Sequence, residues 1–144
     1  MNFRSNSYKQ KEIIMDIVTR KLTDIQVFLK YTYSIVPIVA GTDKFFNFLT
    51  SWSEYLNPTL AGFLPFSEKI FMMTVGIIEI IAGVSVFLKP HIGAYVVCVW
   101  LVLIALTLIA SGNYFDVAVR DLVMAIGAFT LAKLSSLHSA SNSK

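Results

Sequence analysis

The stretch Phe66-Ser-Glu-Lys-Ile-Phe-Met-Met-Thr-Val-Gly-Ile-Ile-Glu-Ile-Ile-Ala-Gly-Val-Ser-Val-Phe-Leu88 places one acid, Glu79, inside an otherwise apolar run. About 20 mainly apolar residues are enough to cross a bilayer, so this stretch predicts a transmembrane helix. A charge near the middle of such a helix costs at least ~2.5 kcal/mol to insert. We therefore expect Glu79 to be neutral, paired with a cation, or directed into a polar cavity.

The composition of the whole chain is typical of a membrane protein. Of its 144 residues, 56% are hydrophobic and 15% are charged, and its mean hydropathy is +0.67. A soluble domain carries about 25% charged residues. The basic residues flank apolar segments and form no basic domain, which argues against nucleic acid as a partner. Because Cys98 is the only cysteine, the chain can form no disulfide within itself.

Apolar periodicity predicts an all-α fold, a polytopic membrane four-helix bundle. The amphipathic pattern of residues 10–26 indicates either a helix lying in the membrane interface or a plain extension of the first span. The first nine residues are expected to be disordered. The division is therefore an N-terminal segment of residues 1–26, a transmembrane domain of residues 27–134 with spans near 27–49, 67–88, 92–110 and 115–134, and a disordered tail of residues 135–144.

Lysine and arginine positions predict the topology, because they are enriched in cytoplasmic loops. Residues 50–66 and 111–114 contain neither. Both termini are therefore expected on the cytoplasmic side. The basic residues on that side are Arg4, Lys9, Lys11, Arg20 and Lys21 before the first span, Lys89 between the second and third, and Lys133 and Lys144 near the end.

The outer loop of residues 51–66 is apolar and aromatic, with Trp52, Tyr55 and Phe63 among its members. This composition predicts a short helix between spans one and two. One alternative is an aromatic belt at the membrane surface. The other is a lid over a cavity in the bundle.

Five ionisable groups, Asp43, Lys44, Glu79, Arg120 and Asp121, fall in the outer half of the membrane or near its midplane. Two alternatives stay open: a buried salt-bridge network that fixes helix register, or a polar pocket that binds a ligand or moves protons. With three acids and two cations, one acid lacks a full partner. Glu79 is the deepest acid and the one expected to be protonated.

Helical spacing predicts which faces of the spans turn inward. Small residues at Gly76 and Gly83 would let a neighbouring helix approach closely, and Pro37 should kink the first span. The expected inward stripes are Tyr33, Pro37, Gly41 and Lys44 in span one, Met72, Gly76, Glu79, Gly83 and Val86 in span two, and Arg120, Met124, Gly127 and Leu131 in span four.

Motifs for known enzyme chemistry do not stand out. The sequence has no glycine-rich phosphate loop, no His-Glu-x-x-His and no recognisable Ser/His/Asp set. His91 and His138 are not placed to ligate haem or metal within the bilayer. No metal site is predicted, the catalytic residues stay unassigned, and whether the protein is an enzyme stays open.

Three motifs resemble the DoxX-like family of four-helix membrane proteins. They are Gly41-Thr42-Asp43-Lys44-Phe45, Gly76-Ile77-Ile78-Glu79-Ile80-Ile81-Ala82-Gly83, and Arg120-Asp121. The resemblance covers residues 27–134 and implies a compact bundle with its polar motifs inside. It maps the family's Lys, Glu and Arg positions onto Lys44, Glu79 and Arg120, without a catalytic role.

The family is heterogeneous, so the resemblance implies several functions. Relatives include subunits linked to quinone and sulfur-compound oxidation, redox-stress partners, and eukaryotic chaperones or cargo receptors. The first hypothesis is an accessory or interaction subunit in the bacterial inner membrane, with a second copy or another membrane protein as partner. The alternative is a quinone-associated oxidoreductase subunit. The expected pocket is lined by Asp43, Lys44, Glu79, Arg120 and Asp121, with Trp52 and Tyr55 above it.

Under the alternative, quinone is the cofactor. Lys44 or Arg120 would donate a hydrogen bond to a quinone carbonyl, and Glu79 would exchange protons. A transporter is disfavoured, because the four spans show no internal repeat.

Overall fold

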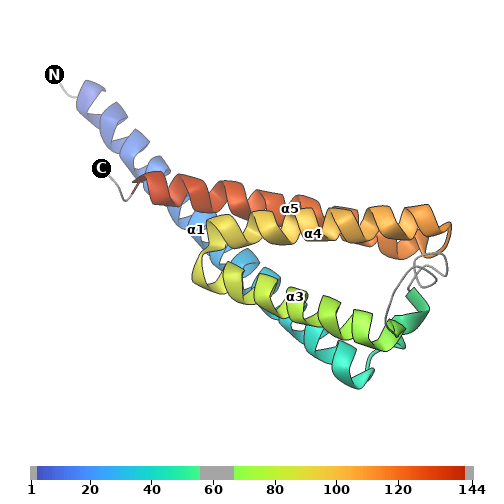
Figure 1. The fold of residues 1–144 in the computed structure, drawn as a ribbon. Coiled ribbons are helices and arrows are strands. Elements are labelled where there is room, and N and C mark those ends of the chain that lie inside the picture. The colour runs from blue at the N-terminus through green and yellow to red at the C-terminus, as the bar shows by residue number, and fades with distance from the viewer. Residues whose placement is uncertain (1–2, 56–66, 142–144) are drawn as a thin grey trace.

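The computed structural model describes residues 3–55 and 67–141, and this part of the chain is all α-helical apart from turns and one short 3₁₀-helix. The all-α prediction is confirmed for these residues. The elements are α1 (Phe3–Phe46), η1 (Trp52–Tyr55), α3 (Glu68–Leu88), α4 (Pro90–Ser111) and α5 (Phe115–Ser141), as Figure 1 shows.

The boundaries of α3 and α4 lie within two residues of the second and third predicted spans. Lys89 separates them, and Pro90 opens α4 at a position where its missing N–H is no loss. Gly112 ends α4 in the left-handed conformation at φ 72°, and its N–H donates to the Ile109 carbonyl at 3.1 Å. A residue without a Cβ adopts this conformation at no steric cost.

At the two ends of the chain, where disorder is expected, the described residues are helical. Residues 3–9 belong to α1, and residues 135–141 belong to α5. Neither segment contains glycine or proline, so each helix propagates by adding one hydrogen bond per residue. A hydrogen bond of 3.1 Å from Gln26 Nε2 to Ser135 Oγ also fastens the end of α5 to α1.

The four helices pack as two close pairs, α1 with α3 and α4 with α5. In the first pair the backbones touch. A Cβ added at Gly41 would lie 2.5 Å from the Gly76 carbonyl oxygen, and one added at Gly76 would lie 2.6 Å from the Gly41 oxygen. Further along, Gly83 faces the carbonyl of Ser34 in the same way. The expected close approach at Gly76 and Gly83 is confirmed, and the neighbour is α1.

The main core joins both pairs at the end where α3 turns into α4. The Tyr33 hydroxyl donates to the Met124 carbonyl at 2.7 Å and so ties α1 to α5. From this end the two pairs spread toward the end that carries η1 (Figure 1). The buried members are Tyr33, Ala82, Val86, Ala94, Val97, Ala128, Leu131 and Ala132.

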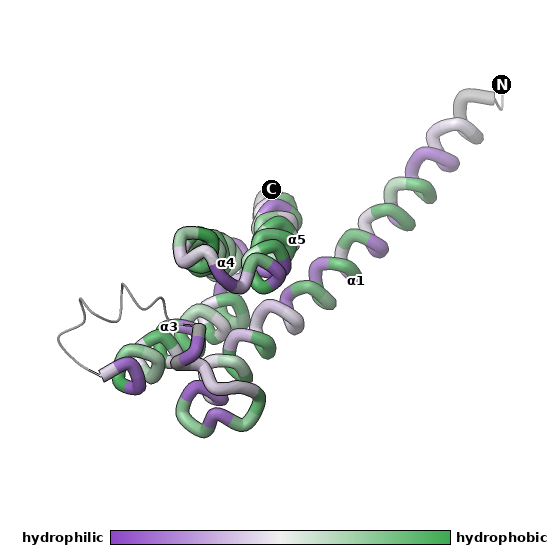
Figure 2. Tube along the Cα trace, turned by 90° about the vertical axis from the view of Figure 1, so that its right-hand side faces the viewer, coloured by the Kyte–Doolittle hydropathy of each residue, from purple (hydrophilic) through white to green (hydrophobic). Residues whose placement is uncertain are grey.

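Two of the helices, α3 and α4, are long and apolar enough to cross a membrane. Only 28% of the most apolar window of each helix is buried inside the protein. Figure 2 shows hydrophobic residues along α4 and α5, whereas hydrophilic and hydrophobic residues alternate along the projecting N-terminal part of α1. That α1 and α5 also cross the membrane stays a prediction. The kink at Pro37, which lies within the continuous α1, stays a prediction as well.

The glycine contact between α1 and α3 yields a first prediction. Replacing Gly76 by valine should destabilise the protein by roughly 1–3 kcal/mol, because the added side chain must push the two backbones apart. The measurement is thermal unfolding in detergent. The matched control is Thr74→Val, an exposed position on the same helix. Equal stability of the two variants would contradict the close contact.

Candidate functional site

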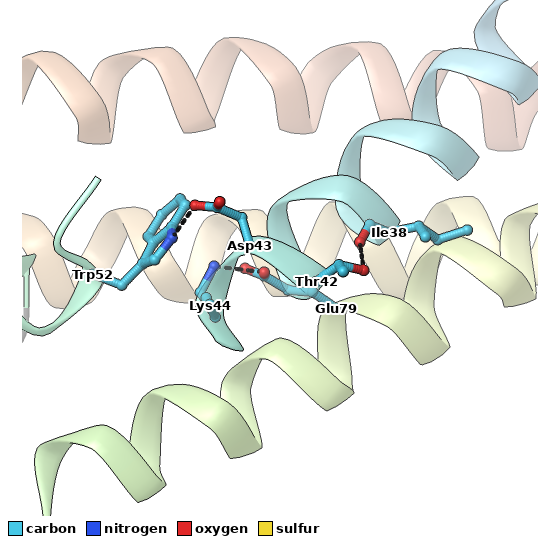
Figure 3. Close-up of polar contacts among 6 residues, drawn as sticks. All are labelled: Ile38, Thr42, Asp43, Lys44, Trp52 and Glu79. Atoms are coloured by element: carbon cyan, nitrogen blue, oxygen red, sulfur yellow. Dashed lines mark hydrogen bonds and ion pairs between the residues drawn. The ribbon is translucent and has the colours of Figure 1, made fainter. Parts of the chain in front are cut away.

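A buried ion pair between Lys44 of α1 and Glu79 of α3 forms the centre of the site. Lys44 Nζ donates to Glu79 Oε2 at 2.6 Å (Figure 3), and the side chains are 5% and 10% exposed. Each residue lies three positions after the glycine at which the two helices touch, Gly41 or Gly76. Because α1 and α3 run in opposite directions, each glycine faces the charged residue of the other helix: a Cβ added at Gly41 would lie 3.1 Å from Glu79 Cβ, and one added at Gly76 would lie 3.2 Å from Lys44 Cβ. The glycine contact therefore brings the two charged side chains within reach of each other.

The ring of Trp52 covers this pair from the segment that follows α1. Its ring centroid lies 3.7 Å from Lys44 Nζ, within the range of a cation–π interaction. Its Nε1–H donates to Asp43 Oδ2 at 2.7 Å (Figure 3). One indole thus stacks on the cation and bonds to the acid beside it, which holds η1 against the end of α1.

Asp43 caps the C-terminal end of α1. Its carboxylate accepts the backbone N–H of Phe48 at 2.9 Å and that of Leu49 at 3.1 Å. Asn47, at φ 52°, ends the helix and donates its N–H to the Asp43 carbonyl. An acid near a helix C-terminus faces the negative end of the dipole. These donors compensate that repulsion and turn the chain back over the cluster.

The other wall of the site comes from α4 and α5. Asp121 is 6% exposed and lies within electrostatic range of Lys44 and Glu79. The indole N–H of Trp100 is buried without a hydrogen-bond partner. It lies close enough to Glu79 to interact with the carboxylate, although it does not reach hydrogen-bond geometry. All four α-helices therefore contribute to the cluster.

Arg120 does not face the interior as expected. Its Nε lies 3.6 Å from Asp121 Oδ1, but its side chain is 65% exposed. Adjacent residues on a helix differ by about 100° in direction, so only one of two neighbouring charges can point inward. In α5 that residue is Asp121, and the stripe beneath it is Ala125, Ala128 and Ala132.

The structure thus brings Asp43, Lys44, Trp52, Glu79 and Asp121 together. Residues 56–66, the greater part of the predicted lid, lie outside the described residues, and so does the side chain of Tyr55. The backbone of Tyr55 belongs to η1, which confirms a short helix after span one. Sequence reasoning missed Trp100, which is a tryptophan in a uniformly apolar span. A buried indole N–H that needs a partner was the available signal.

Of the three acids, Asp43 is the one without an ion pair, Glu79 is paired with Lys44, and Asp121 with Arg120. Backbone and indole N–H groups take the place of a cation at Asp43. Such donors stabilise an ionised carboxylate. The five charges therefore form two ion pairs and one capped acid.

Two grooves in the described part of the chain border this cluster. One, of about 370 Å³, runs between α3 and α4 and is lined by Ile78 and Ala82 on one side. Its other side is formed by Tyr95, Val96, Val99, Trp100 and Leu103. The second, of about 410 Å³, lies on α1 and the segment after it, from Ile38 to Leu49. Of the expected pocket residues, only Asp43 lines either groove, so the polar pocket stays a prediction.

In comparisons with models of protein families, with curated protein sequences and with solved structures, nothing matches this chain. The resemblance to the DoxX-like family therefore rests on the short motifs around Lys44, Glu79 and Arg120-Asp121. The function has to be inferred from the geometry of the cluster.

The buried ion pair yields a second prediction. Lys44→Met should destabilise the protein by about 3 kcal/mol, because it leaves the Glu79 carboxylate buried without its cation. Lys44→Met combined with Glu79→Leu should recover most of that loss, since no buried charge remains. Chemical unfolding in detergent measures both variants. Arg120→Ala is the control. It should lower the free energy of unfolding by under ~1 kcal/mol, because the arginine of this ion pair is exposed.

A double variant as unstable as Lys44→Met would contradict this account. It would show that the packing of the lysine stem, and not the charge, supports the helix pair.

Proposed function

We propose that this chain is a four-span integral membrane protein of the DoxX-like type, and that it acts as a non-catalytic interaction subunit of a larger membrane complex. The observation that carries the proposal is the internal closure of the charge cluster. Lys44 is bonded to Glu79, Asp43 to three N–H donors, and Asp121 to Arg120. Of these contacts, the Lys44–Glu79 pair joins α1 to α3 and holds the two helices in register, whereas the contacts of Asp43 and Asp121 are local.

The apolar outer surface supports insertion into a membrane. Large hydrophobic side chains are exposed on every α-helix, for example Phe28, Ile81, Val99 and Ile126. Contiguous exposed apolar area of this kind marks contact with lipid or with another protein. Within a bilayer, helices associate by close packing and polar contacts. The glycine contact and the buried ion pair supply both.

The apolar outer faces of α1 and α3 support interaction with a partner. Lys44 and Glu79 are turned inward, so between Ile70 and Leu88 of α3, and between Phe28 and Thr42 of α1 apart from Lys30, the outer faces of these helices carry no charged side chain. Such faces can pack against the spans of another protein without burying an unpaired charge. The internal network would keep those faces in a fixed arrangement.

The topology yields a third prediction. Reporter fusions at Glu54, in η1, and after Lys144 should lie on opposite sides of the membrane, with the latter in the cytoplasm. Lysine and arginine are absent from residues 50–66 and present at both ends. A phosphatase reporter and a fluorescent reporter together detect the two sides. Both reporters on the same side would contradict the proposed topology, in which α3, α4 and α5 cross the membrane between the two fusion sites.

The accessory role yields a fourth prediction. After extraction in a mild detergent, the wild-type chain should migrate in an assembly larger than one chain in its micelle. The double variant Lys44→Met with Glu79→Leu should keep that assembly. In this proposal the buried Lys44–Glu79 pair stabilises the fold and does not contact the partner. Native electrophoresis with immunodetection measures both. A wild-type chain that migrates alone would refute the interaction proposal.

A quinone titration distinguishes the alternative, a quinone-associated oxidoreductase subunit. The unpartnered N–H of Trp100 favours this alternative, because it is a buried donor that a carbonyl oxygen could satisfy. Purified wild type, Lys44→Ala and Arg120→Ala are compared with a soluble quinone. Under the accessory proposal all three show the same weak partitioning. Binding that either substitution abolishes would support the alternative instead.

A further inference from the structure

The groove between α3 and α4 has the form of a ligand site. It lies between the two helices that are apolar enough to cross a membrane. Its volume of about 370 Å³ is within the range of sites for small molecules. Its lining is aliphatic, with the rings of Tyr95 and Trp100 added. Such a lining suits a hydrocarbon chain.

Beyond one end of this groove lies a cation, Lys89, in the turn between the two helices. On α3, Ile78 and Ala82 line the groove, and helical spacing continues that stripe through Ser85 to Lys89. On α4, Leu103, Val99 and Val96 line it, and the same spacing leads back through Ile92 to Lys89. Lys89 is exposed in the turn that joins the two helices. The two stripes that line the groove therefore both lead toward Lys89.

Aromatic side chains connect the groove to a second lysine. Tyr95, which lines the groove, stacks edge-on with Phe129 of α5 at 6.0 Å between ring centroids. Lys133 Nζ lies 5.3 Å from the centroid of Phe129. At the same end of the bundle, Lys30 of α1 lies over the ring of Phe87 at 5.1 Å. Rings and cations gathered at one level are typical of a membrane interface.

These cations form no ion pair among the described residues. Residues 25–42, 80–115 and 122–144 contain no Asp or Glu, and the acid nearest to Lys30 along the chain is Asp24, six residues before it on α1. Among the described residues, the ion pairs are Asp16–Arg20, Lys44–Glu79 and Arg120–Asp121. None involves these three lysines. Their charge is available to an external anion.

We propose that the α3–α4 groove binds an anionic phospholipid, with one acyl chain along the groove and the phosphate at Lys89. Tyr95, at the near end of the groove, lies six residues from Lys89, or about 9 Å along a helix. The glycerol and ester groups would span this interval. Basic sites at the cytoplasmic ends of transmembrane helices bind anionic headgroups. This inference rests on the membrane insertion proposed above.

A partner's transmembrane helix is the competing occupant of an apolar groove. It would fill the apolar part equally well, but it would give no reason for three lysines without ion pairs at the end of the bundle that carries Lys89. The lipid accounts for both the groove and the charge.

The test uses lipids with brominated acyl chains, which quench tryptophan fluorescence on contact. A Trp52→Phe background makes Trp100, which lines the groove, the only tryptophan. The protein is placed in phosphatidylcholine vesicles, and brominated phosphatidylglycerol or brominated phosphatidylcholine is titrated in. Phosphatidylglycerol should quench at several-fold lower mole fraction. Lys89→Ala should reduce this preference about five-fold, whereas Lys69→Ala, at the opposite end of α3, should leave it unchanged.

A second variant tests the groove itself. Val99→Phe should fill part of it and lower quenching by brominated phosphatidylglycerol to the level of brominated phosphatidylcholine. Equal quenching by the two lipids in the Trp52→Phe background would overturn the lipid site and leave the membrane protein intact. Equal loss of preference in Lys69→Ala and Lys89→Ala would also overturn it, because the effect would be surface charge. Absence of quenching by either lipid would refute membrane insertion as well.

Discussion

The structure depends on placing a lysine and a glutamate together where water is scarce. Removing two charges from water costs several kcal/mol for each, and only near-ideal geometry offsets that cost. The geometry here is a 2.6 Å contact made possible by two glycines, Gly41 and Gly76, at which the helix backbones touch. A larger residue at either position would separate Lys44 from Glu79. The helix contact and the ion pair thus require each other.

The segment after α1 completes this arrangement with one motif. In Thr42-Asp43-Lys44 the acid and the cation are adjacent, so they leave the helix in different directions. Asp43 turns toward the end of the helix and receives the backbone of Phe48 and Leu49, while Lys44 turns toward α3. Trp52 contacts both. The loop therefore closes the helix end and covers the ion pair with the same side chain.

Much of this arrangement could be predicted from the sequence, and the exceptions have physical causes. The position of Glu79 follows from the cost of exposing an acid to lipid, and the approach at Gly76 from the absence of a side chain. Which of Arg120 and Asp121 faces the interior could not be predicted. The two are adjacent and point in different directions, and the cost of exposing a charge to lipid applies to both. Asp43 has no ion pair because the chain reverses at Asn47 and brings N–H donors to its carboxylate. No pattern in the sequence predicted this reversal. The unpartnered N–H of Trp100 depends on how far α4 lies from Glu79.

The length of α1 has a mechanical consequence. Its 44 residues extend about 66 Å at 1.5 Å per residue, roughly twice the ~30 Å hydrocarbon core of a bilayer. Its N-terminal part projects beyond the other helices (Figure 2). The helix is continuous, and it is fastened to α3 by the glycine contact and to α5 by Tyr33 and Gln26. A tilt of about 10° of α1 relative to the other helices would move its projecting end by several ångströms, far more than it would move the ion pair.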